Sequence, residues 1–236
     1  MFPSAFFLFN EAHTAQKNAE KLLSIVAQYH QSLPEKVFGV THDAASNNTG
    51  KQFVQAVPWD IRICCWAHKA SNAAKRLFAE DSDAQRVLVC AKKLTRAFGQ
   101  QHAWNALKKA QQGKTVVLPR FSDTRFNGGY IVFNSLLQQQ SNIETALDEL
   151  KTEHPTTYTQ LTKPMHGKPY SCIPTRADWA VIEDLVRALE LLQSFIVSLQ
   201  CANLTLSDAL MRYRVLMYQL QKASIKTTFH VQLIEL

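Results

Sequence analysis

The spacing of apolar residues over the last two thirds of the chain most constrains its fold. From residue 84 onward, apolar side chains recur every three or four positions in one segment after another, which predicts amphipathic helices. Asp178 is expected to be the N-cap of the strongest of these helices. Only seven glycines occur in 236 residues, which also favours helices over turn-rich β folds. We expect the helices at 84–98, 103–110, 130–150, 179–199 and 204–220.

The first 81 residues follow a different pattern, in which helical and strand-like segments alternate. Short β-branched and aromatic runs at 37–40 and 61–65 predict buried strands, separated by a helix that ends before Pro58. Strands that alternate with helices usually pair in parallel. We therefore expect an α/β fold that is mostly helical, with one domain at 1–81 and a helical region at 82–236.

Positive charge gathers in the middle of the chain. The whole sequence has 26 Lys and Arg against 19 Asp and Glu, a formal net charge of +7. Residues 62–125 alone hold 13 basic and 4 acidic residues, so this middle carries +9 and the remainder −2. Two interpretations stay open, a surface that faces phosphates and an ordinary solvated helix face.

Cysteine usage and hydropathy indicate the compartment. The five cysteines are odd in number and two of them, Cys64 and Cys65, are adjacent, which argues against a disulfide framework and for a reducing compartment. The apolar stretch at 2–9 lacks the preceding Lys or Arg of a signal peptide. No apolar run approaches the roughly 20 residues that cross a bilayer. We expect an intracellular protein with no membrane partner.

Asp43 is the first candidate for chemistry. It directly follows the first expected strand, and ligands and metals bind at the carboxyl ends of strands in open α/β sheets. A divalent cation such as Mg²⁺ would need one or two such carboxylates, and no second acid lies nearby in sequence. The alternative is that Asp43 caps a turn or helix.

Two further segments carry candidate residues. Cys65 and His68 have the Cys-x-x-His spacing of half a zinc site, although a buried thiol beside a hydrogen-bonded histidine is the alternative. Arg120, Arg125 and Phe126 belong to a basic, aromatic segment suited to phosphate contact and base stacking. An ordinary capped turn is the alternative there.

In this order, the segments resemble the transposases of the hAT superfamily. Residues 40–48 (VTHDAASNN) are similar to the family's strand-end aspartate, and residues 63–72 (ICCWAHKASN) to its Cys-x-x-His segment. Residues 123–127 (DTRFN) resemble its Thr-Arg-Trp-Asn segment, with Phe126 in the place of tryptophan. Asp178 and the following tryptophan resemble the start of a later helical region. The resemblance spans about residues 37–200.

The resemblance implies a fold and a site. It implies an incomplete ribonuclease-H-like core at 1–81, followed by an all-α insertion domain. Asp43 would be the second acid of an Asp-Asp-Glu set that holds two divalent metals, Mg²⁺ or Mn²⁺, with Cys65 and His68 close to it. Arg120, Arg125 and Phe126 would contact DNA.

Two acids of that set have no counterpart here. No Asp precedes the first expected helix, at 14–32, and the final Glu would be expected beyond Leu236. One carboxylate cannot hold two metals, so we expect no tight metal binding and no strand transfer from this chain alone. We expect a nuclear, catalytically incomplete remnant or domesticated protein that binds DNA or another transposase-like chain. The alternatives are a metal-dependent strand transferase whose missing acids come from a partner chain or a longer product, and a non-catalytic helical scaffold.

Overall fold

The computed structural model describes residues 14–29, 39–42, 55, 61–122, 128–163, 171, 173–201, 204–223, 229 and 233. The chain divides into two compact units, Met1–Lys69 and Ala70–Leu236, and helix α5 (Trp66–Glu80) crosses that division. The domain boundary expected after residue 81 lies beyond that division, between α5 and the next helix.

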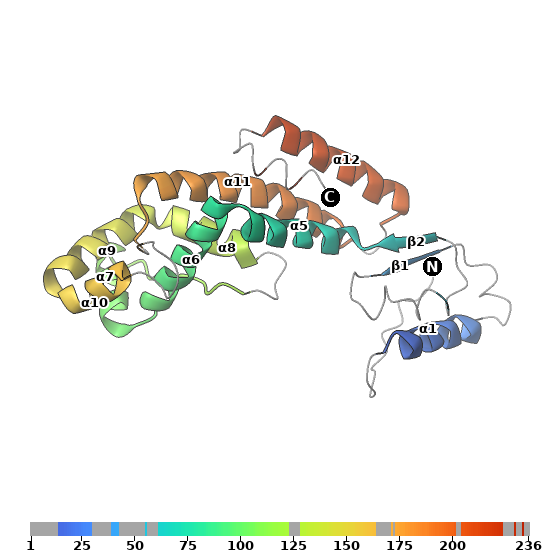
Figure 1. Ribbon diagram of the computed structural model, residues 1–236, viewed down its shortest axis with the longest axis horizontal. Coiled ribbons are helices and arrows are strands. Elements are labelled where there is room, and N and C mark those ends of the chain that lie inside the picture. The colour runs from blue at the N-terminus through green and yellow to red at the C-terminus, as the bar shows by residue number, and fades with distance from the viewer. Residues whose placement is uncertain are drawn as a thin grey trace. The chain divides into compact units, whose positions relative to one another are not determined.

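The first unit contains one helix and a two-stranded sheet. Helix α1 (Ala15–Tyr29) has Ala19 fully buried. Strands β1 (Gly39–His42) and β2 (Ile61–Cys64) pair in parallel (Figure 1), and Gly39 lies opposite Ile61 at one end of the ladder. The sequence pattern therefore located both strands and their parallel pairing.

The expected fold class is nevertheless wrong. The sheet in the described part of the chain consists of β1 and β2 alone, each four residues long, and every other element there is a helix. A single pair of such short strands cannot form the packed central sheet of a ribonuclease-H-like core, because such a sheet is covered by helices on its faces. The protein is all-α in class, with one small parallel ladder.

The second unit is a helical array. The spacing of apolar residues located most of its helices, but residues 130–150 form two helices rather than one, with the break at Gln139. Helix α10 was not expected, because its first residue is Pro155 in a proline-rich stretch. Proline is well tolerated at the first helical position, where its missing N–H has no intrahelical partner. The helices after α5 are α6 (Ser82–Ala97), α7 (Gln101–Ala110), α8 (Gly128–Gln138), α9 (Gln140–Glu153), α10 (Pro155–Thr162), α11 (Arg176–Ser198) and α12 (Leu206–Lys222).

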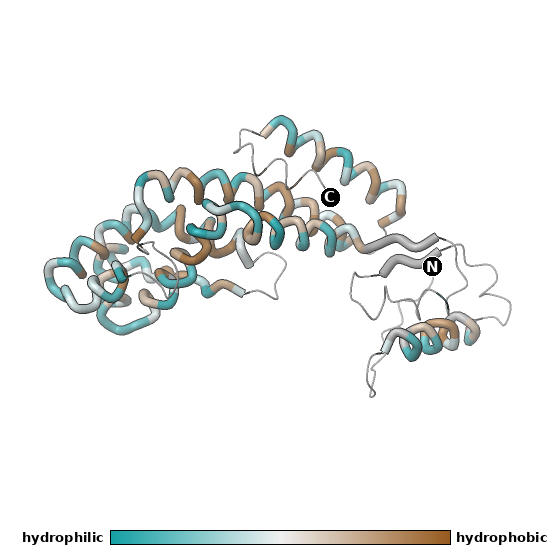
Figure 2. The backbone as a smooth tube through the Cα atoms, viewed as in Figure 1, coloured by the Kyte–Doolittle hydropathy of each residue, from teal (hydrophilic) through white to brown (hydrophobic). Residues whose placement is uncertain are grey.

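Helix α11 is central to the packing of this unit. It contacts α6, α8 and α12, and Figure 2 shows apolar residues along its length. Its N-cap is Thr175, not Asp178 as expected. Asp178 is the third helical residue and completes a capping box with Thr175. The apolar side chains that α11 buries are those of Trp179, Ile182, Leu185, Val186, Ala188, Leu189, Leu192, Phe195 and Ile196.

A buried ion pair joins α6 to α11. The Arg86 guanidinium contacts the Asp178 carboxylate, whose side chain is only 4% exposed. Arg86 also contacts Asp83, one turn earlier on α6. Helices α7, α9 and α10 pack together beyond this junction, and α10 also contacts α6.

Candidate nucleic-acid interface

A basic groove lies where the second half of α6 faces α10. Its volume is about 360 Å³, and α6 supplies three cationic side chains to it. Among the residues that the structure describes, no carboxylate lines this groove. Its lining residues are Lys92, Lys93, Arg96, Ala97, Gln100, Thr157, Gln160 and Leu161.

Local contacts hold the two lysines in place. The Lys92 ammonium lies 4.3 Å from the centroid of the Phe121 ring, within the range of a cation–π interaction. Lys93 donates hydrogen bonds to the carbonyl oxygens of Leu161 (3.4 Å) and Lys163 (2.7 Å), at the end of α10. The Lys93 side chain therefore ties α6 to α10 and fixes the two walls of the groove.

Two arginines lie at the end of α6. Arg96 is in the last turn of the helix and is exposed. A Cβ added to Gly99 would lie 3.6 Å from Arg120 Nη2, so the Arg120 guanidinium reaches the chain just after α6. Arg120, which the sequence singled out, is thus close to the C-terminal end of the helix that supplies the groove's cations.

The charge around the groove is not balanced by acids in the same stretch of chain. Residues 84–122 contain eight Lys and Arg and no Asp or Glu. Two cations of this stretch pair with acids from outside it: Arg86 contacts Asp83 and Asp178, and Lys109, on α7, bridges to Glu149 (3.2 Å) and Glu153 (3.7 Å) of α9. The Glu149 carboxylate raises the pKa of Lys109, and the two acids together compensate its charge. The three cations that line the groove, Lys92, Lys93 and Arg96, are therefore not offset by any acid of the same stretch.

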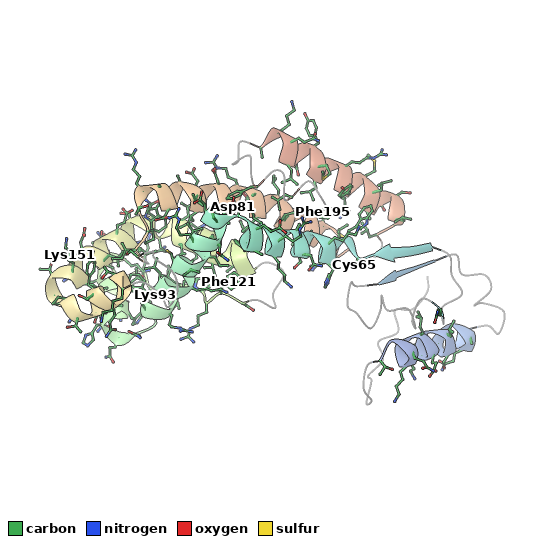
Figure 3. All side chains as sticks on the ribbon, in the orientation of Figure 1. Cys65, Asp81, Lys93, Phe121, Lys151 and Phe195 are labelled. Atoms are coloured by element: carbon green, nitrogen blue, oxygen red, sulfur yellow. The ribbon has the colours of Figure 1, made fainter. Side chains whose placement is uncertain are left out.

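Phe121 also lines an apolar pocket of about 440 Å³. Phe78 meets Phe121 edge to face with ring centroids 6.4 Å apart, and Phe78 stacks on Phe133 at 5.8 Å. Phe121 therefore has one contact with Lys92 and another with the aromatic cluster of the helical unit. These contacts hold Phe121 in place beneath Lys92, which lines the basic groove. Figure 3 labels Phe121 and, on α6, Lys93.

The structure separates the candidates that the sequence named. Asp43, Arg125 and Phe126 lie outside the described residues. Cys65 and His68 flank the start of α5, both half-buried, and the Cys65 thiol is free. Within the described ranges, no group of three or more His, Cys, Asp or Glu side chains is placed to hold a metal ion.

The groove was not predicted from the sequence. Lys92, Lys93 and Arg96 belong to the basic middle of the chain, but two of the polar residues that face them, Thr157 and Gln160, come from α10. A recognisable signal was present, because Lys-Lys-x-x-Arg places three cations within two helical turns in an acid-free stretch.

Comparisons with protein-family models, with curated proteins and with solved structures found no match to this chain. In the described part of the chain, no helix has both the length and the apolar character needed to cross a bilayer.

Proposed function

We propose that the chain is a non-catalytic DNA-binding protein, related to the central part of a hAT-type transposase and acting in the nucleus. The groove between α6 and α10 contacts the phosphate backbone of duplex DNA. The observation that carries the proposal is the grouping of Lys92, Lys93 and Arg96 in one groove, with no carboxylate among the described residues that line it. The resemblance of residues 37–200 to hAT transposases supports DNA as the polyanion.

The chemistry of the groove suits a sugar–phosphate backbone. Arg96 presents a planar set of donors that matches phosphate oxygens, and the lysine ammonium groups add point charges. The side-chain amides of Gln100 and Gln160 and the hydroxyl of Thr157 are the polar groups that commonly contact phosphates and sugars. Such contacts position a protein on DNA but do not read its sequence. Binding should therefore depend weakly on sequence and strongly on salt.

Fluorescence anisotropy with a labelled 20-base-pair duplex tests the proposal. The affinity of the full chain should fall linearly with salt on a logarithmic plot, and Arg96→Gln should reduce the slope by about 0.9, one phosphate contact. Lys151→Gln is the matched control, because Lys151 is exposed on α9 and does not line the groove. Equal effects of the two variants, or binding that does not respond to salt, would overturn the proposal and favour a scaffold.

A second pair of variants tests the α10 wall without removing a cation. Gln160→Glu places a carboxylate in the groove, whereas Gln221→Glu makes the same change at an exposed position of α12. We expect Gln160→Glu to weaken DNA binding several-fold more than Gln221→Glu.

Removing or adding divalent cations distinguishes DNA binding from strand transfer. We expect EDTA to leave the affinity unchanged, and Mg²⁺ or Mn²⁺ to produce no cleavage of the duplex. Metal-dependent cleavage would instead support a strand transferase.

A further inference from the structure

Helix α12 has one face packed against α11. The rings of Phe195 and Tyr213 have centroids 6.5 Å apart, and Leu216 and Leu220 are buried. The Arg212 guanidinium donates a hydrogen bond to the carbonyl oxygen of Ser198 at the end of α11. These contacts fix which side of α12 faces the rest of the unit.

A second apolar face of α12 is exposed. Met211, Val215 and Tyr218 are 58%, 51% and 61% exposed, and their spacing of four and three residues aligns them on one side of the helix. Asp208 and Lys222 extend the same stripe, each seven residues from Val215. We call these five residues the outer stripe.

The outer stripe is symmetric in its chemistry. Its centre is the β-branched Val215, larger apolar side chains lie on either side, and the two ends carry opposite charges. In an antiparallel pair of such helices, Val215 meets its own copy and Asp208 of each helix meets Lys222 of the other. A parallel pair would instead place Asp208 beside Asp208 and Lys222 beside Lys222, which is repulsive.

We propose that two copies of this chain associate through antiparallel packing of their outer stripes. The contact is isologous, as in most homodimers, because the same patch is used on both copies. It removes the stripe's three exposed apolar side chains from water and pairs the two terminal charges. This association goes beyond DNA binding and does not depend on it.

The charged ends are available for that pairing. The hydrogen bonds from Thr205 to Asp208 both end on Oδ2, so Oδ1 can accept a bond from the partner. The Lys222 ammonium lies 5.9 Å from the centroid of the Tyr218 ring, and both residues are exposed. Lys222 therefore lies over the stripe and can reach a carboxylate that packs against it.

Sedimentation velocity of the full chain without DNA tests the association. We expect the mass to rise with concentration toward twice the 26.7 kDa of one chain. Val215→Glu should hold the mass at that of one chain over the same range, because it places two carboxylates at the two-fold axis. Val117→Glu is the matched control, since Val117 is 69% exposed between α7 and α8, and it should still associate. A wild-type chain that stays monomeric, or equal effects of the two variants, would overturn the proposal and leave the stripe to a different partner.

Disulfide cross-linking tests the orientation. In the antiparallel pair, Val215→Cys should give a cross-linked dimer that reductant dissolves, measured against the background from the five native cysteines. Lys222→Cys should not, because the two copies of residue 222 would be about 21 Å apart along the pair, far beyond the reach of a disulfide. Efficient cross-linking by Lys222→Cys would contradict the antiparallel arrangement.

Discussion

Helices α11 and α12 begin with the same bonds in very different surroundings. In each, a threonine N-cap and an aspartate three residues later form a capping box. The Thr175 hydroxyl donates to Asp178 at 2.7 Å, and the Thr205 hydroxyl donates to Asp208 at 2.6 Å. Asp178 is buried against Arg86, whereas Asp208 is exposed. The local sequence sets the helix start in both cases, and the surroundings set how much the fold depends on it.

The two helices also differ in how much of their surface is buried. Helix α11 buries side chains along its whole length, while α12 buries only Leu216 and Leu220 and leaves the outer stripe exposed. Substitutions on α11 should therefore act on stability. Substitutions on the outer face of α12 should act on association and leave the free energy of unfolding of the monomer nearly unchanged.

The largest difference in stability between matching substitutions on α11 and α12 is expected at Asp178 and Asp208. Asp178→Ala removes the capping acceptor and leaves the partly buried Arg86 guanidinium without its main partner, so we expect a loss of about 3–5 kcal/mol in the free energy of unfolding. Urea denaturation followed by circular dichroism measures it. Asp208→Ala is the matched control and should cost much less, because no buried charge is left behind. Adding Arg86→Met to Asp178→Ala should recover part of the loss, and a full loss in the double variant would show that the ion pair is not its source.

The apolar faces of the two helices provide the next comparison. Leu192 on α11 is 2% exposed, and Leu192→Ala should destabilise the fold by about 2–5 kcal/mol because a cavity remains. Leu210 on α12 is 41% exposed, and Leu210→Ala should change the free energy of unfolding by less than about 0.5 kcal/mol. Similar losses in urea denaturation would mean that α12 is as deeply packed as α11.

The threonine caps should be nearly equivalent. Thr175 and Thr205 are both exposed and make matching bonds, so replacing either by Ala should cost about 1 kcal/mol. Thermal unfolding of the two variants in one buffer provides the measurement. A clearly larger loss of stability for Thr175→Ala than for Thr205→Ala would show that Thr175 also orients Asp178 toward Arg86.

The part of the fold that the sequence predicted is the part governed by local spacing. Helices α6, α7, α11 and α12 were located from apolar residues on one helix face, because that periodicity follows from helix geometry. The break at Gln139 and helix α10 were missed, since Pro155 marks a helix start as readily as a loop. The fold class was wrong because short β-branched runs show where strands lie but not how many strands meet.

Of the groove between α6 and α10, the sequence predicted the positive charge but not the position. The count of basic residues in the middle of the chain includes Lys92 and Arg96, but their facing residues on α10 lie about 60 positions later in the sequence. A groove formed by non-local packing has no pattern along the chain. Arg120 was named from its neighbours in sequence, and its position beside Gly99 brings it to the end of α6.

The smallest expected effect concerns the protonation of the exposed cap. Hydrogen bonds from the Thr205 hydroxyl and backbone N–H lower the pKa of Asp208 below its ordinary value of 3.8, since they favour the carboxylate form. A carboxyl group whose pKa is lower in the folded state than in the unfolded state stabilises the fold at pH values above its unfolded pKa. That contribution is lost as the pH falls through the folded pKa. The α12 cap should therefore be intact at neutral pH and weaken only in acid, below about pH 4.

Nuclear magnetic resonance titration of the Asp208 carboxyl carbon measures this pKa directly. Thr205→Ala should raise the Asp208 pKa toward 3.8, because the hydroxyl donor is lost, while Thr175→Ala should leave it unchanged. The second variant is the control for a general change in stability, since it removes the same group from the other helix. If Thr205→Ala leaves the Asp208 pKa unchanged, the Thr205 hydroxyl does not bond to Asp208 as the Thr175 hydroxyl bonds to Asp178. The different effects of substituting Asp178 and Asp208 would then not be due to burial alone.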